Sequence, residues 1–351
     1  MKKDELENKI LGCLSMVAIG DALGMPTHDL TSDEISRRFG GPVRDFHPPG
    51  PDSRVHPRHR AAEITDDTLL TLAAARSYLE GRGRVDPLSV ARGTAAALAR
   101  ARESGREMMF GPSTRRCVEA LEAGLDPLAA ALAEKHPLSG ASNGGAMKVS
   151  PAGLVHPGDL EAAAADALTI CLPSHATVAG VSAAAAIAAG VAEAVTPRAD
   201  VYSVAQACLW GAAAGERLAV ERVRRTPLPS LPERIKLAIQ LVLTAGDPVA
   251  ANRRLVEVIG AGLAAYESVP AAIGVFLANG GVPEKCVLAG ANIGYDTDTI
   301  ASLAGALSGA LHGFAGVPVK WYERVVEVNG LDLAGLARDL ADLASGAGGG
   351  S

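Results

Sequence analysis

The chain has 351 residues, a formal net charge of −6 and 48% hydrophobic residues. This composition is sufficient for a real hydrophobic core in one large domain or two smaller ones. The basic residues are dispersed, so the sequence lacks the basic stripe that a nucleic-acid partner requires, and we expect none. Aromatic residues are only 3%, whereas alanine and glycine dominate the apolar segments, which favours closely packed helices over a β core. The expected fold class is all-α.

The cysteines and apolar segments indicate the compartment. The five cysteines are widely spaced and form no C-x-x-C pair, so neither a disulfide framework nor a zinc site is indicated. The residues before Cys13 lack the apolar region of a signal peptide, and residues 176–192 are mainly Ala, Gly and Ser, which gain little from lipid. We therefore expect a cytoplasmic monomer or small homo-oligomer with no membrane partner.

Helical periodicity and helix-terminal signals place the expected elements in chain order. The first helix covers residues 4–23, and a long loop rich in Pro, Gly, His and Arg covers residues 40–63. Thr65 then caps a helix, and Asp247 caps a later one. Further helices are expected over residues 87–103, after 111–114, and over 159–172, 175–195, 199–224, 233–243, 248–266, 300–311 and 333–343.

We read residues 1–344 as one helical domain, because no composition break divides them and no repeat recurs. Residues 345–351 have the composition of a flexible Gly-rich tail. In the long loop, His47, His56 and His59 are expected to be exposed, because Pro57 breaks the helical register that H-x-x-H metal ligation would use.

Two acidic segments lie at expected helix starts, TDDT at residues 65–68 (the first acidic segment) and DTDT at residues 296–299 (the second acidic segment). Each alone is explained by an ordinary capped helix start. Together they suggest one site, because four clustered carboxylates would repel at about 4 kcal/mol per close pair at an effective dielectric constant of 20 and would need cations. Oxygen ligands favour Mg²⁺, Mn²⁺ or Ca²⁺ over zinc or copper. The spacing leaves open whether the segments meet.

Three further segments each have a structural and a ligand-binding interpretation. Residues 143–148, NGGAMK, would let a ligand approach the backbone closely, or form a plain turn. His175 begins an Ala-rich helix as a cap, a core residue or a catalyst. Residues 111–114, GPST, offer free N–H groups to an anion such as phosphate, or a simple cap.

Taken in order, these blocks resemble the ADP-ribosylglycohydrolase family, which includes the dinitrogenase-reductase-activating glycohydrolase and the jellyfish J1 crystallins. The resemblance covers nearly the whole chain and implies a single, orthogonally packed multi-helix domain with two divalent cations, Mg²⁺ or Mn²⁺, in a cleft. The matching blocks are GDALG at 20–24, both acidic segments, GPST at 111–114, Asn143-Gly144 with Met147, Ser174-His175, and Gly294.

The resemblance also implies roles for individual residues. Family members bind a terminal ribose over the metals and hydrolyse its bond at the anomeric carbon, where paired metals orient the ribose and position a water. Asp67 and Asp298 are expected to be catalytic as well as metal ligands. The implied metal ligands are Thr65, Asp66, Asp67, Asp296, Asp298 and Thr299, and the implied substrate contacts are Gly111, Pro112, Ser113, Asn143, Gly144, Met147, His175, Gly294 and Tyr295.

The chain departs from its relatives at three places. They commonly carry Gly where Tyr295 stands, Arg where Lys148 stands, and a glutamate after GDALG, where this chain reads PTHD at residues 26–29. Asp29, which we assign as catalytic, and Glu34 are the candidates for that carboxylate. Lysine also lacks the planar bidentate donor of arginine, so recognition of a phosphate or carbonyl could differ.

The expected function is metal-dependent hydrolysis of a ribosyl N- or O-glycosidic bond, removing ADP-ribose from a modified protein or a small ADP-ribosyl compound. A hydrolase of another ribosyl metabolite, such as a nucleoside-like N-riboside, and a non-catalytic, crystallin-like role are the alternatives.

Overall fold

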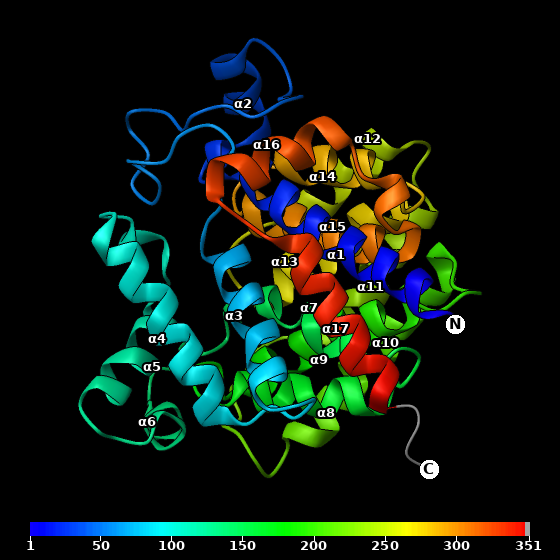
Figure 1. Ribbon diagram of the computed structural model, residues 1–351. Helices are drawn as coiled ribbons and strands as arrows, with labels where there is room; N and C mark the ends of the chain where they lie inside the picture. The colour runs from blue at the N-terminus through cyan, green and yellow to red at the C-terminus, as the bar shows by residue number, and fades with distance from the viewer. Residues whose placement is uncertain (348–351) are drawn as a thin grey trace.

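The structure, a computed structural model, describes residues 1–347 and is built almost entirely of helices (Figure 1). Within these residues there is no β-strand, only isolated bridges between Ser142 and Ala264 and between Thr177 and Arg224. The all-α expectation is confirmed. The α-helices are α1 (Lys3–Gly24), α2 (Ser32–Phe39), α3 (Asp66–Glu80), α4 (Pro87–Glu103), α5 (Pro112–Glu122), α6 (Pro127–Ala133), α7 (Ser150–Val155), α8 (Leu160–Cys171), α9 (Val178–Ala194), α10 (Val201–Ala219), α11 (Leu231–Leu243), α12 (Pro248–Arg254), α13 (Ala265–Ala278), α14 (Pro283–Asn292), α15 (Thr297–His312), α16 (Val319–Asn329) and α17 (Leu333–Ala347).

Helices α1 and α15 form the most extensive helix pair of the fold, because small residues let their backbones approach closely. A Cβ atom added at Gly20 would lie 2.4 Å from the carbonyl oxygen of Ala301, and one added at Gly24 would lie 2.4 Å from the amide nitrogen of Asp298. This packing brings the C-terminal end of α1 against the N-terminal end of α15, where the second acidic segment begins.

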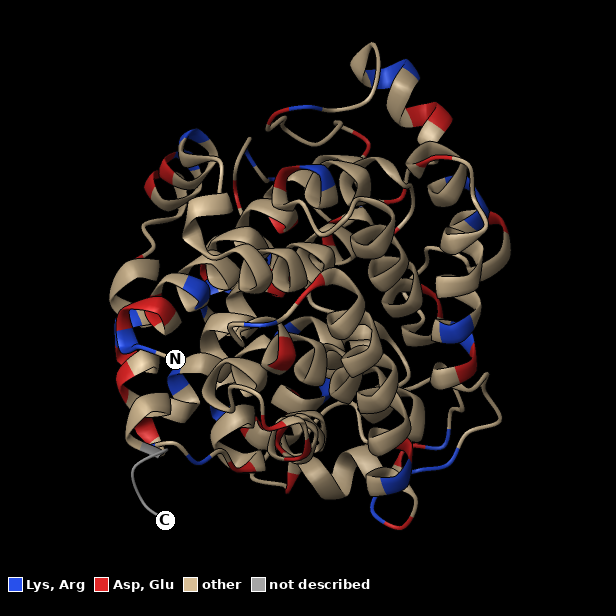
Figure 2. Cartoon of the chain, turned by 90° about the vertical axis from the view of Figure 1, so that its right-hand side faces the viewer, with Lys and Arg blue, Asp and Glu red and all other residues tan. Residues whose placement is uncertain are grey.

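The most apolar helices are core helices of the fold. Among the described residues, one segment, Lys3–Thr27, is long and apolar enough to cross a membrane, and 94% of its most apolar window is buried inside the protein. The Ala-rich α9 is likewise buried along almost its whole length, against α8 and α10. The central helices in Figure 2 are mostly uncharged, and most charged residues lie around the outside of the bundle.

Several boundaries differ from those expected. The sequence does not predict α2, α7, α14 or α16, and it predicts only the first two residues of α13, Ala265 and Tyr266. The helix expected over residues 248–266 is divided into α12, a π-helical turn at Leu255–Ile259 and the start of α13, and the break lies at Gly260, which has φ 93°. Helix α17 continues to Ala347, so residues 345–347 of the expected tail are helical, and residues 348–351 lie outside the described residues.

Helix α3 lies between the main bundle and a lateral group formed by α4, α5 and α6 (Figure 1). The expected long loop over residues 40–63 is confirmed, since no helix interrupts it between α2 and α3. It returns the chain from α2 to the start of α3, where the first acidic segment lies. The long loop therefore meets the C-terminal end of α1 and the N-terminal ends of α3 and α15 at one place.

Candidate metal centre and substrate cavity

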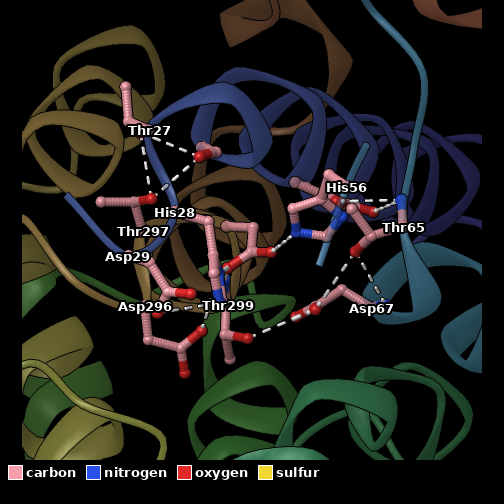
Figure 3. A network of polar contacts seen from close by, with 12 residues as sticks. Thr27, His28, Asp29, His56, Thr65, Asp67, Asp296, Thr297 and Thr299 are labelled. Atoms are coloured by element: carbon pink, nitrogen blue, oxygen red, sulfur yellow. Dashed lines mark hydrogen bonds and ion pairs between the residues drawn. The ribbon is translucent and has the colours of Figure 1, made fainter. Parts of the chain in front are cut away.

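The two acidic segments meet at the N-terminal ends of α3 and α15. The Thr299 hydroxyl donates to Asp67 Oδ2 over 3.3 Å, which joins them directly (Figure 3). Thr65 is the N-cap of α3, as expected, and its Oγ1 accepts from the amide of Asp67. Asp296 in turn accepts from the side-chain amide of Asn143. All four aspartates of the two segments are at most 7% exposed.

A fifth carboxylate, Asp21, fixes the first acidic segment from behind. It lies in the GDALG block of α1, is fully buried, and accepts from the amides of Thr65 and Thr68 and from the Thr68 hydroxyl. These bonds satisfy donors at the start of α3 and so set the position of Asp66 and Asp67. The sequence signal was present, since an aspartate inside an otherwise apolar helix requires a partner.

The clustered carboxylates raise one another's pKa values. Burial, followed by the charge of Asp298, raises the pKa of Asp66 well above its usual range, and burial with Asp21 does the same for Asp67. Burial and Asp298 raise the pKa of Asp296 to about 8. Asp67 Oδ1 is buried and has no hydrogen-bond partner among the residues that the structure describes. Crowded carboxylates with an unpaired oxygen are a donor set that fits hard divalent cations.

His28 lies in the segment PTHD that follows the GDALG block. Its Nδ1 lies 2.8 Å from Asp298 Oδ1 and 3.6 Å from Asp296 Oδ1. Burial opposes protonation of this imidazole, but the charge of Asp298 prevails and raises the pKa of His28 to about 10. Burial would likewise raise the pKa of Asp298, and His28 holds it well below the usual range instead.

The expectation of exposed loop histidines is wrong for His56 and His59, and His47 is half-buried. His56 and His59 are 1% and 5% exposed, because the loop folds back over the acidic segments. His56 Nε2 lies 3.2 Å from Asp298 Oδ2, and the His59 ring packs edge-on against His56 with centroids 4.9 Å apart. The objection raised by Pro57 applies to ligation from a helix, whereas these side chains reach the site from an irregular loop.

A cavity of about 100 Å³ opens over the acidic segments. Most residues that the sequence assigned to the metal or the substrate line this cavity. His28, His56 and Ser142, which the sequence did not assign, line it as well. The assigned residues in the lining are Asp66, Asp67, Gly111, Pro112, Ser113, Asn143, Gly144, Met147, His175, Asp296, Asp298 and Thr299.

Five of the residues that the sequence assigned or offered as candidates lie outside the cavity lining: Thr65, Asp29, Glu34, Gly294 and Tyr295. Tyr295 is 49% exposed and has φ 60°, a left-handed conformation that explains why glycine suits this position. Asp29 is exposed and lies 3.6 Å from the outer nitrogen of His28. Glu34 caps α2 through Thr31, and Gly294 is buried against the backbone at Leu30. The structure therefore places His28 between Asp29 and Asp298, and Glu34 at the start of α2.

Lys148 is buried behind the cavity and reaches it through other side chains. Its ammonium donates to Ser174 Oγ over 2.9 Å, Ser174 Oγ lies 2.8 Å from His175 Nδ1, and His175 Nε2 lies 3.0 Å from Ser142 Oγ. Because an ammonium can only donate, the Ser174 hydroxyl is free to donate to Nδ1, and His175 then donates from Nε2 to Ser142. The chain of bonds leaves the Ser142 hydroxyl as a donor at the cavity wall.

A larger cavity of about 450 Å³ lies between α3, α4 and the end of α16. Its lining includes Arg60, Arg76, Arg100 and Arg106 but no residue of either acidic segment. The smaller cavity is the candidate site because the converging carboxylates and imidazoles, and not volume, indicate chemistry.

The whole chain matches known proteins. The family model described as ADP-ribosylglycohydrolase matches residues 2–349. The chain belongs to the ADP-ribosylglycohydrolase family. This membership places it among the hydrolases of glycosidic bonds and confirms the resemblance drawn from the motifs.

Individual relatives extend the match. The Escherichia coli K12 protein YegU, whose name carries no function, is 31% identical over 95% of this chain and 96% of its own. The ADP-ribosylarginine hydrolase Tri1 of Pseudomonas putida GB-1 is 26% identical over 90% of this chain and 73% of its own. A solved structure titled ADP-ribosylglycohydrolase-related protein complex has a TM-score of 0.66 at 23% identity, covering 97% of this chain and 99% of that one, and shares the fold.

Proposed function

We propose that this protein is a metal-dependent hydrolase that removes ADP-ribose from a modified protein or a small ADP-ribosyl compound. In the reaction, water attacks the anomeric carbon of the ribose, the glycosidic bond breaks, and the leaving nitrogen or oxygen takes up a proton. The observation that carries the proposal is the convergence of both acidic segments on one cavity, joined by the Thr299–Asp67 hydrogen bond.

The proposed ligands of the divalent cations, Mg²⁺ or Mn²⁺, are carboxylate and hydroxyl oxygens of side chains in the two acidic segments. Bound cations would neutralise the carboxylates, orient ribose hydroxyls and acidify a water. The unpartnered Asp67 Oδ1 supports this proposal, because a buried acceptor without a donor is costly unless a ligand satisfies it. The proposed set is Thr65, Asp66, Asp67, Asp296, Asp298 and Thr299.

The remaining cavity residues have separate tasks. Asn143 orients Asp296, and the Ser142 hydroxyl, polarised by the chain from Lys148, can donate to a substrate oxygen. The helix start at Gly111–Ser113 forms another wall, where amides without intrahelical acceptors can face phosphate. Asp67 and Asp298 are the proposed catalytic carboxylates.

A smaller ribosyl substrate is the second candidate. The cavity of about 100 Å³ can enclose a sugar ring, whereas sites that enclose a drug-sized ligand have roughly 300–1,000 Å³. Either the rest of ADP-ribose lies along the rim, or the natural substrate is a compact N-riboside. The name of the Pseudomonas relative favours arginine-linked ADP-ribose as the first substrate to test.

The decisive experiment is a substrate panel. Protein stripped with a chelator and then supplied with Mg²⁺ or Mn²⁺ is incubated with ADP-ribosyl-arginine, ADP-ribosyl-serine, poly-ADP-ribose and ribonucleosides, and released ADP-ribose or ribose is measured by chromatography. We expect metal-dependent release from at least one ADP-ribosyl substrate. Release from nucleosides alone would favour the second candidate. No release from any substrate, with no metal bound, would leave the non-catalytic alternative.

A further inference from the structure

We propose that His28 and His56 are nitrogen ligands of the cation held by Asp298, and that this centre consequently selects a first-row transition ion over Mg²⁺. This inference rests on the proposed metal dependence and adds the class of ion. Sequence reasoning pointed to a site of oxygen donors alone. The structure adds two imidazoles on the opposite sides of one carboxylate.

His28 is held at the site by the end of α1. The hydroxyl of the preceding residue, Thr27, is within hydrogen-bond distance of the carbonyl of Gly24 (2.8 Å), the carbonyl of Ala291 (2.7 Å) and Thr297 Oγ1 (3.0 Å). These contacts anchor the turn between α1, α14 and α15, so the neighbouring imidazole is directed at Asp298 Oδ1. Only 9% of the His28 side chain is exposed.

His56 reaches the other oxygen of the same carboxylate. Its amide hydrogen-bonds to Ser53 Oγ over 3.1 Å, and its carbonyl accepts from the amide of His59, which closes a turn under the ring. One ligand atom each from His28, His56 and Asp298 lies within 4.8 Å of the other two, which is compact enough for one cation after small side-chain rotations.

Buried ring nitrogens without hydrogen-bond partners lie at and next to His56. Within residues 1–347, the buried side-chain atoms that have no hydrogen-bond partner include His56 Nδ1, both ring nitrogens of His59 and Asp67 Oδ1. Buried polar atoms in folded proteins are normally paired. The pattern fits a centre whose geometry is completed by an ion and its bound water.

Nitrogen donors change which ion is preferred. Mg²⁺ takes octahedral oxygen ligands and gives up its water reluctantly, whereas imidazole is a good ligand for Fe²⁺ and Zn²⁺, and the affinity of a given site rises from Mn²⁺ through Fe²⁺ to Co²⁺. The opposing possibility is that His28 acts only as a cation that neutralises Asp298, with no nitrogen bound to metal. The two possibilities make different predictions, because only a metal-bound imidazole would couple its nitrogen nucleus to the electron spin of the bound ion.

Pulsed electron paramagnetic resonance on the chelator-treated, full-length protein with Mn²⁺ alone tests this directly. We expect ¹⁴N modulation typical of imidazole ligands. Titration calorimetry with Zn²⁺ and Mg²⁺ is the second measurement: His28→Ala and His56→Ala should each lower Zn²⁺ affinity roughly tenfold or more and change Mg²⁺ affinity little. His136→Ala, which removes an exposed imidazole, is the matched control.

The outcomes separate this inference from the proposed function. Bound Mn²⁺ without nitrogen coupling in the unsubstituted protein contradicts the inference and leaves a metal-dependent hydrolase intact. Equal losses of Zn²⁺ and Mg²⁺ affinity in the folded variants contradict it as well. Failure of the unsubstituted protein to bind any divalent ion contradicts the proposed function itself.

Discussion

His28 Nδ1 lies 2.8 Å from Asp298 Oδ1, while His56 Nε2 lies 3.2 Å from the other oxygen of the same carboxylate. Asp298 is therefore the residue on which the end of α1, the long loop and the start of α15 converge. Its neighbours Asp66, Asp67 and Asp296 have raised pKa values, whereas its own is lowered. It is the carboxylate best prepared to remain ionised at neutral pH.

Asp298→Asn should abolish hydrolysis while leaving the helical fold intact. The substitution preserves shape and removes the charge that we propose holds the cation. We expect kcat/KM to fall by more than roughly 100-fold, the upper end of the cost of losing a residue that merely orients a ligand. Chromatographic assay measures activity, and circular dichroism checks the fold. Wild-type turnover in this variant would refute the ligand assignment.

Asp21→Asn should weaken both stability and metal affinity without touching the cavity. Asparagine keeps one acceptor oxygen, but its amide group, which donates, takes the place of the second oxygen. Because both oxygens of Asp21 accept from the Thr65 amide, one donor would then face another, and the start of α3 would shift together with Asp66 and Asp67. We expect the free energy of unfolding to fall by about 1–3 kcal/mol and Mn²⁺ affinity to fall roughly 10- to 100-fold. Urea denaturation and calorimetry measure these, with the exposed Asp339→Asn as control. Unchanged Mn²⁺ affinity would show that Asp21 does not position the site.

Gly24→Ala should destabilise the α1–α15 contact and disturb the second acidic segment together. A Cβ at this position would lie 2.4 Å from the Asp298 amide nitrogen and from the Thr297 carbonyl oxygen, both backbone atoms. Overpacking of this kind costs typically about 1–3 kcal/mol. Gly246→Ala is the control, because nothing lies within 4 Å of its Cβ. Equal thermal unfolding temperatures for the two variants would contradict the close packing.

His175 should make the protein acid-sensitive. Burial, followed by the charge of Lys148, lowers its pKa well below the usual range, so the native imidazole stays neutral. Below about pH 6.5 the unfolded chain binds a proton that the native state does not, so stability is lost as pH falls. Relative to His175→Gln, the wild type should lose about 1.4 kcal/mol per pH unit between pH 6 and 5. Urea denaturation at pH 7, 6 and 5 measures this, and parallel profiles would contradict a neutral buried histidine.

Local signals in the sequence were sufficient for much of the fold. Thr65 and Asp247 cap α3 and α12 as predicted, because a cap depends on residues a few positions apart. The sequence predicted one helix over residues 248–266, but α12 ends at Arg254 and α13 begins at Ala265. The alternating Gly and apolar residues near Gly260 do not distinguish a break from a continuous helix. The amphipathic α16 has no strong cap and went unpredicted.

The site was predictable where its residues occur in motifs and unpredictable where it depends on long-range folding. The acidic segments and most of the cavity lining were found from ordered blocks. His56 was missed because its loop has no periodicity, and its contact with Asp298 spans 242 positions. His28 was noted only as part of the segment PTHD at residues 26–29 and was given no role, since nothing local shows that α1 ends against α15.

Anomalous diffraction at the manganese edge, from crystals grown with Mn²⁺, tests most directly whether the two acidic segments form one cation-binding centre. We predict an anomalous peak at the floor of the cavity, within roughly 2.0–2.6 Å of a carboxylate oxygen from Asp67 and from Asp298. A cavity without an anomalous peak, in crystals that bind Mn²⁺ elsewhere, would contradict a shared metal centre.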